Sequence, residues 1–299
     1  MVLDWPYEGA TPPIDNVARF VHPASNVCLD FHGDPRLARL VVFADGNHHM
    51  ALAEALGLFR SRYPAVDDIF YATTPPRVIV EALKSGALLV GNLRLSVTPH
   101  VFISPAPVLE RLRQDGHVRE HHPFAQSRGS VLLVRKGNPQ RITGAADLAR
   151  ADVRIFLSNP VTETVSYDLY ATTLRRIAAR DGLDCGFLDA APGALPRVVH
   201  GDCIHHREAP QCLADGRADV AVVVSHLALG YTRIFPDLFD VVALTADNDP
   251  AQVINTLHIG LVRDGGEWGA RLTEFMRGEE VGAVYRYHGL VPSHESPSP

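Results

Sequence analysis

Short apolar runs alternate with amphipathic segments along the first third of the chain. The runs LVVFA (40–44), DIFYA (68–72) and HVFIS (100–104) have the length and the β-branched and aromatic content of buried strands. A segment with helical periodicity follows each run, the first over 48–62 with its apolar residues on one face. This order predicts a mostly parallel sheet covered by helices.

The same alternation continues through the rest of the chain. Further strands are predicted in SVLLVRKGNP (130–139), VRIFLSNP (153–160), RVVH (197–200), DVAVVVS (219–225) and VINTLHIGLV (253–262). Helices are predicted at about 166–180, 206–215 and 267–277. A chain of 299 residues is long enough for two such α/β lobes.

Three segments depart from this pattern. Residues 1–38 are rich in Pro, Asp, Asn and Gly, and we expect an extension over the surface that is too short for a helix-turn-helix domain. The charged and histidine-rich segment 114–126 is expected to be a linker, with His121 and His122 facing solvent. The tail 291–299 has the composition of a disordered segment.

Composition excludes several classes of protein. The net charge of −6 comes without a basic block, which argues against a nucleic-acid partner. No apolar run approaches the roughly 20 residues that span a bilayer, so no membrane insertion is expected. The N-terminal MVLDWPYEGATPP is not a secretory signal, which predicts a cytoplasmic protein if the chain is complete and a periplasmic one if a signal was removed.

Several motifs, in their order along the chain, carry a family resemblance. VVFADGNHHMALAEAL, HVFISPAPVLERL, PFAQSRGSVLLVRKGNP, ITGAADLARADVRIFLSNP, LADGRADVAVVVSHLAL and the closing YRYHGL are similar to segments of the molybdate- and tungstate-binding proteins that serve ABC transporters. The resemblance implies a type II periplasmic-binding fold of two lobes with a ligand cleft between them. Lobe 1 would comprise 39–122 and 246–290, and lobe 2 would comprise 123–245. An ABC transporter permease or another ligand-receiving protein would be the partner.

The ligand positions implied by the resemblance depart from the family in part. The hydroxyl of the first loop falls at Asn47, while Thr74 on the second loop and a backbone N–H near Val165 still fit an oxyanion. The last loop often has a tyrosine in the family, and here it has Val223 followed by Ser225. Asn47 is also a suitable N-cap for the helix over 48–62.

Histidines gather near these altered positions, which suggests a different ligand. Neutral imidazoles that converge can hold zinc, nickel, copper or iron, none of which the sequence distinguishes. The predicted metal ligands are His48, His49, His205, His206 and His226, with Glu163 and Cys203 in reach. Each of these histidines also has a simpler interpretation as a solvated loop residue, and protonated histidines would suit an anion instead.

We therefore expect a solute-binding protein that captures a small ligand, with a divalent transition metal or small metal complex as the first hypothesis. The alternative keeps the molybdate- or tungstate-type oxyanion of the family. A metal-dependent enzyme on this fold is the third possibility, but the chain has no GxSxG, HExxH, P-loop or GxGxxG motif, so we expect no enzyme.

Overall fold

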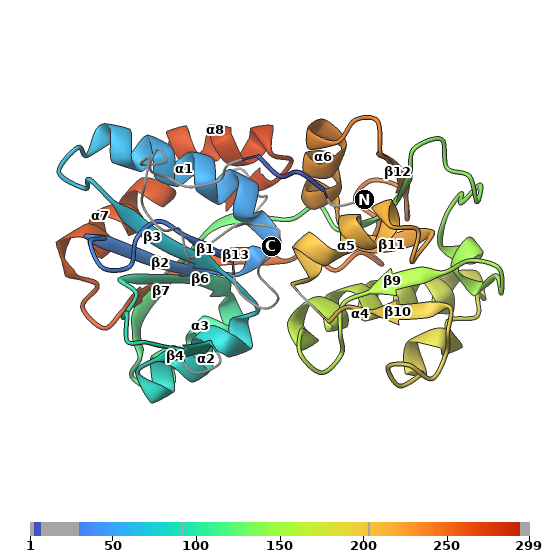
Figure 1. Cartoon of the computed structure of the whole chain (residues 1–299), viewed down its shortest axis with the longest axis horizontal. Helices are drawn as coiled ribbons and strands as arrows, with labels where there is room; N and C mark the ends of the chain where they lie inside the picture. The colour runs from blue at the N-terminus through green and yellow to red at the C-terminus, as the bar shows by residue number, and fades with distance from the viewer. Residues whose placement is uncertain (1–2, 7–29, 91–92, 203, 294–299) are drawn as a thin grey trace. The chain divides into compact units, whose positions relative to one another are not determined.

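The computed structural model describes residues 3–6, 30–90, 93–202 and 204–293. The chain divides into two compact units. The central unit consists of residues 1–6 and 127–255, and the flanking unit consists of residues 7–126 and 256–299. Each unit has its own sheet, covered by its own helices (Figure 1). The α/β fold class predicted from the sequence is confirmed.

The flanking unit is built on a seven-stranded sheet of order β1-β3-β2-β6-β13-β7-β14. Its strands are β1 (Asp30–His32), β2 (Leu40–Ala44), β3 (Ile69–Thr73), β6 (Val101–Pro105), β7 (Val118–Gln126), β13 (Thr256–Val262) and β14 (Val291–Pro292), with a separate hairpin of β4 (Leu88–Val90) and β5 (Leu93–Leu95). One face packs against α1 (His49–Arg62), α7 (Gly266–Met276) and α8 (Glu279–Tyr287), and the other packs against α2 (Pro76–Ser85) and α3 (Ala106–Gln114).

The central unit is built on a five-stranded sheet of order β10-β9-β11-β8-β12. Its strands are β8 (Ser130–Arg135), β9 (Ile155–Leu157), β10 (Val198–His200), β11 (Val220–Val224) and β12 (Phe239–Ala243). Its helices are α4 (Thr164–Asp181), α5 (His205–Ala214) and α6 (Ser225–Ile234), with 3₁₀ turns η2 (Ala145–Ala149) and η3 (Gly186–Asp189). Every residue of β11 is buried, as its continuous apolar sequence predicts.

The sheets are mixed, which corrects the prediction that they are mostly parallel. Among the described strands, β3-β2-β6 and β10-β9-β11 are the parallel sets, and every other pairing is antiparallel. Strand β13 enters its sheet at the end where the parallel strands finish, so it runs antiparallel to β6 and β7. Strand β8 does the same in the central unit, where Ser130 at its start pairs with Val224 at the end of β11.

Three local predictions were wrong. Residues 30–32 form the buried strand β1, and Leu3 and Trp5 are buried against α5 and α6 rather than spread over the surface. The expected linker 114–126 is mostly strand β7, because residues 118–126 pair with β13 along nearly their whole length. Helix α8 was missed. The rest of the extension (7–29) and most of the tail (294–299) lie outside the described residues.

Candidate functional site

Polar residues follow the parallel strands of the flanking unit. Asp45 follows β2, Thr73 and Thr74 end β3, and Ser104 lies near the end of β6. Ladder hydrogen bonds bring these ends together, since the Asp45 N–H donates to the Ile103 carbonyl at 2.9 Å and the Thr74 N–H donates to the Ala44 carbonyl at 2.9 Å. The carboxyl ends of parallel strands are where α/β folds bind ligands. We therefore take this strand edge as a candidate ligand-binding edge of the flanking unit.

Two hydroxyls on this edge are buried without hydrogen-bond partners. The side chains of Thr73 and Ser104 have no exposed surface, and within the described part of the chain neither hydroxyl has a partner. A buried polar group left unsatisfied costs about 1–3 kcal/mol. Such groups call for an explanation, and a ligand that supplies the missing hydrogen bond is one.

Asp45 is a buried carboxyl beside these hydroxyls. Its Oδ1 accepts the Asn47 N–H at 3.1 Å, so Asp45, and not Asn47, caps the 3₁₀ turn η1 (Gly46–His48) before α1. This corrects the predicted N-cap, because the helical geometry starts earlier than the apolar pattern shows. Burial raises the pKa of Asp45 to about 6, although the hydrogen bond from Asn47 opposes the rise. The carboxyl is therefore ionised at neutral pH and becomes neutral in mild acid.

His48 and His49 lie on the same edge and are buried. The Nδ1 atom of His48 lies 2.8 Å from the hydroxyl oxygen of Tyr285 in α8, and the imidazole packs edge-on against Phe124. Burial raises the pKa of Tyr285 well above its ordinary value, so the phenol stays neutral. The aromatic core of the flanking unit thus fixes the orientation of the His48 ring.

The central unit has a matching edge. Ser158 follows β9, Ser225 begins α6 after β11, and Ser130 begins the neighbouring antiparallel strand β8. Their hydroxyls are buried and have no hydrogen-bond partner among the described residues. Val165 lies in the first turn of α4, where backbone N–H groups are free of intrahelical partners, as the sequence predicts.

The remaining predicted metal ligands contact other residues of the central unit. The His205 ring lies between Phe156 and Tyr170, with centroids 5.4 and 5.2 Å away, and burial lowers its pKa to about 3. Glu163 Oε1 accepts the His205 N–H at 3.0 Å, so this carboxylate caps α5.

His206 and His226 are buried in the first turns of α5 and α6. The His206 carbonyl accepts the Tyr231 hydroxyl at 2.6 Å. Cys203 lies outside the described residues.

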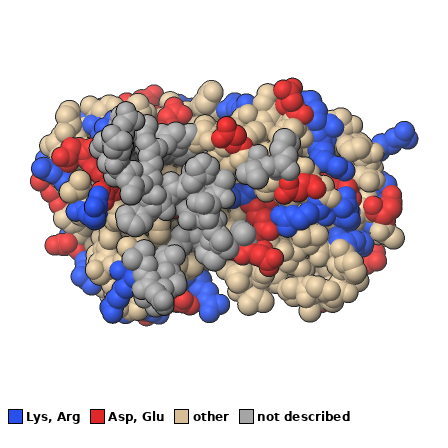
Figure 2. Space-filling view, viewed as in Figure 1, with Lys and Arg blue, Asp and Glu red and all other residues tan. Residues whose placement is uncertain are grey.

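The structure does not support a transition-metal site. Among the described residues, no group of three or more histidine, cysteine, aspartate or glutamate side chains is placed to hold a metal ion. Each of the two strand edges instead has hydroxyls and helix N-termini, which are groups that bind anions. Figure 2 shows acidic and basic side chains interspersed among the described residues of the face in view.

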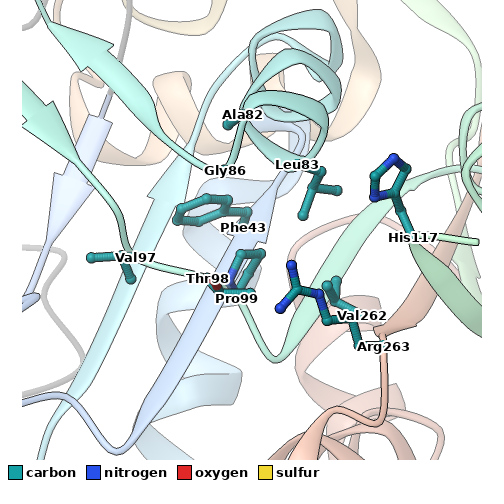
Figure 3. Close-up of a pocket in the computed structure, with 10 residues that line it drawn as sticks. All are labelled: Phe43, Ala82, Leu83, Gly86, Val97, Thr98, Pro99, His117, Val262 and Arg263. Atoms are coloured by element: carbon teal, nitrogen blue, oxygen red, sulfur yellow. The ribbon is translucent and has the colours of Figure 1, made fainter.

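A small pocket in the flanking unit lies apart from the strand edge. It is lined by Phe43, Ala82, Leu83, Gly86, Val97, Thr98, Pro99, His117, Val262 and Arg263 (Figure 3). Its volume of about 20 Å³ holds roughly one water molecule. The described residues that line it include none of the predicted ligand residues, so it is no candidate for the solute site.

The family of the chain follows from its sequence match. The model of the bacterial extracellular solute-binding proteins matches residues 40–291, which include every described polar residue of the two strand edges. The chain belongs to this family. Among curated proteins, no sequence matches this solute-binding protein. No helix in the described ranges is long and apolar enough to cross a membrane.

Solved structures confirm the fold. The periplasmic molybdate-binding protein of Azotobacter vinelandii is 17% identical, with a TM-score of 0.62 over 87% of this chain and 100% of that one. The sulfate-binding protein SubI of Mycobacterium tuberculosis is 15% identical, with a TM-score of 0.60 over 86% and 87%. PEB3 of Campylobacter jejuni, bound to L-phospholactate, is 15% identical, with a TM-score of 0.57 over 84% and 99%.

Sequence reasoning missed five polar residues of the two strand edges: Asp45, Thr73, Ser104, Ser130 and Ser158. Ser104 and Ser158 lie in segments that were used only for the family resemblance, HVFISPAPVLERL and ITGAADLARADVRIFLSNP. A signal was present, because each of the five is a polar residue at or next to one terminus of an apolar strand. Their lack of hydrogen-bond partners could be seen only in three dimensions.

Proposed function

We propose that this solute-binding protein captures a small anionic solute, an oxyanion or a compound that bears one, and delivers it to an ABC transporter permease. The observation that carries the proposal is a set of buried hydroxyls at the ends of β3, β6 and β9 that have no hydrogen-bond partner among the described residues. Hydroxyl and backbone N–H donors suit an anion, and hydrogen bonds to a charged group are worth about 1.5–3 kcal/mol each.

The ligands of the similar structures support the same class. Molybdate, sulfate and L-phospholactate, named for the three proteins above, are all oxyanions or carry them. We extend the shared chemistry to this chain and leave the individual compound to experiment. Work outside the cytoplasm is part of the proposal, since a protein that feeds an importer meets its solute there.

Isothermal titration calorimetry with sulfate, molybdate, tungstate, inorganic phosphate and L-phospholactate tests the proposal, with zinc and nickel titrated in parallel. We expect saturable one-to-one binding of at least one oxyanion and weaker or no binding of the metals. Thr73→Val and Ser104→Ala should each weaken that binding by about tenfold, which corresponds to about 1.4 kcal/mol. Ser61→Ala is the matched control, because the Ser61 hydroxyl lies on the exposed face of α1 and donates to the Gly57 carbonyl. Binding of zinc or nickel alone would overturn the proposal in favour of the metal hypothesis.

A further inference from the structure

Three side chains form a polar chain across the flanking sheet. Glu110 lies in α3, His121 in β7 and His258 in β13. His121 Nε2 lies 3.3 Å from Glu110 Oε2, and His121 Nδ1 lies 3.0 Å from His258 Nδ1. His121, predicted to face solvent, has only 14% of its side chain exposed. We call this set the histidine relay.

The chemistry of the three groups fixes the direction of their hydrogen bonds. An ionised carboxylate only accepts, so His121 Nε2 must carry the proton that it donates to Glu110. In the neutral ring, His121 Nδ1 is then an acceptor, and His258 Nδ1 must donate to it. The remaining nitrogen of His258, Nε2, is therefore an acceptor while the relay is neutral.

His258 also lies beside a hydroxyl of the candidate site. Its backbone pairs directly with Ser104 across the antiparallel ladder of β13 and β6, so the two side chains share one face of the sheet. The Ser104 hydroxyl is buried and has no partner within the described residues. Both residues lie at the end of the sheet where the parallel strands finish.

One added proton would reverse the donor and acceptor roles in the hydrogen bond between His121 and His258. His121 would then hold a proton on both nitrogens, and it would donate to Glu110 and to His258 Nδ1. His258 would then carry its own proton on Nε2, which becomes a donor, while the new charge stays paired with Glu110. Arg113 and His121 together already hold the pKa of Glu110 down to about 2, so this carboxylate is ionised throughout.

A second proton is resisted by the surroundings. Burial, with the neighbouring His121 and His122, lowers the pKa of His258 to about 4. The charged and titratable groups around the relay are Glu110 and Arg113 from α3, and Glu120 and His122 from β7, where His122 lies 3.6 Å from Glu120. A positive charge on His121 or His122 therefore opposes protonation of His258.

We propose that Ser104 and His258 form an oxyanion subsite that works as a donor pair only after the His121–His258 pair takes up a proton. The inference rests on the proposed function, because it assigns a proton-linked contact to the same anion. Binding of the anion and uptake of the proton then favour each other, as thermodynamic linkage requires.

Calorimetry with sodium sulfate at pH about 8 and about 5.5, in buffers of different ionisation enthalpy, measures the protons taken up per sulfate bound. Sulfate remains a dianion over this range, so any uptake belongs to the protein. We expect wild-type affinity to rise about tenfold on acidification, with uptake approaching one proton. His121→Gln and Glu110→Gln should lose most of this gain. His288→Gln should keep it, because His288 pairs with Glu54 at 2.8 Å without a second histidine.

Asp45 also titrates on this edge, so Asp45→Asn serves as a second background. The effect of His121→Gln must persist in that background. Nitrogen-15 NMR of histidine-labelled protein gives an independent readout, with His258 protonated on Nδ1 at pH about 8 and on Nε2 at pH about 5.5.

Sulfate binding with the same pH response in His121→Gln would overturn the relay alone. Failure of wild type to bind sulfate at either pH would overturn the subsite, and failure with every oxyanion of the panel would overturn the proposed function.

Discussion

The imidazole of His48 and the phenol of Tyr285 face each other across 237 residues of sequence, with 2.8 Å between Nδ1 and the hydroxyl oxygen. The contact joins the turn after β2 to helix α8, which the sequence did not predict. It therefore connects the candidate site to the closing segment of the chain. Tyr285 is almost fully buried, so loss of its hydroxyl would leave part of the imidazole without this partner.

Tyr285→Phe should lower the free energy of unfolding by about 1–2 kcal/mol, as expected when a buried hydrogen bond loses one member. Urea denaturation followed by circular dichroism measures the change. Tyr287→Phe is the control, because Tyr287 is 61% exposed and should change stability by less than about 0.5 kcal/mol. Equal stabilities for the two variants would show that the His48–Tyr285 contact contributes nothing.

Asp45 should give the protein an unusual dependence on pH. Its folded-state pKa of about 6 lies above the unfolded value of about 3.9, so the folded state holds more protons between these values. Stability contributed by this group is therefore present in acid and is lost as the pH rises through about 6. Asp45→Asn should raise the free energy of unfolding by about 1–3 kcal/mol at pH about 8 and leave it unchanged at pH about 4.

The matched control for this effect is Asp67→Asn, since the Asp67 side chain is 70% exposed. Its substitution should have the same small effect at both pH values. If Asp45→Asn destabilised the protein at pH about 8, the carboxylate would be stabilising the fold, and its burial would not be the dominant influence on it.

Glu163 should act through α5. The Glu163 carboxylate accepts the His205 N–H at 3.0 Å at the positive end of the helix dipole. Glu163→Ala should cost about 0.5–2 kcal/mol of stability, whereas Glu163→Gln should cost less because its amide oxygen can still accept. Denaturation of the three proteins side by side checks the order. Equal losses for both variants would mean that the contact with the His205 N–H is not the source of the stabilisation.

The sequence predicts a strand well where the strand is buried and its residues are therefore continuously apolar. LVVFA, HVFIS and DVAVVVS are strands within a residue or two, because continuous apolar runs of that length suit a buried sheet. Segment 114–126 was misjudged as a linker because its sequence is polar. In the structure it forms strand β7, and His121 and His122 are partly buried there. Strand β1 was missed because its pairing with β3 is a long-range contact.

The sequence indicated where to look for the candidate site better than it indicated the chemistry. The residues that the family resemblance assigns to the ligand lie in the turns and first helical turns that follow strands, and their contact with a ligand stays a prediction: Asn47, Thr74, Val165 and Ser225. The histidines attracted attention by type, yet His205 packs between two aromatic rings, and that environment depends on Phe156 and Tyr170 from other elements. The serines and threonine of the strand edges are common residues whose importance comes from their unsatisfied burial.

The unsatisfied hydroxyls predict opposite effects on stability and binding. Thr73→Val and Ser104→Ala remove a buried polar group that has no partner among the described residues, so the ligand-free protein should be as stable or more stable by up to about 1 kcal/mol. Oxyanion binding should weaken in the same variants. Thermal melts with and without the bound oxyanion measure both effects. Loss of stability without ligand would instead assign these hydroxyls a structural role.

The most direct test of the central claim is native mass spectrometry of freshly purified protein, with elemental analysis of the same sample. We predict a bound species whose mass corresponds to an oxyanion or an oxyanion-bearing solute, released on denaturation, with transition metals well below one equivalent. A stoichiometric zinc, nickel, copper or iron ion, with no anionic solute, would contradict the account and restore the histidines as ligands.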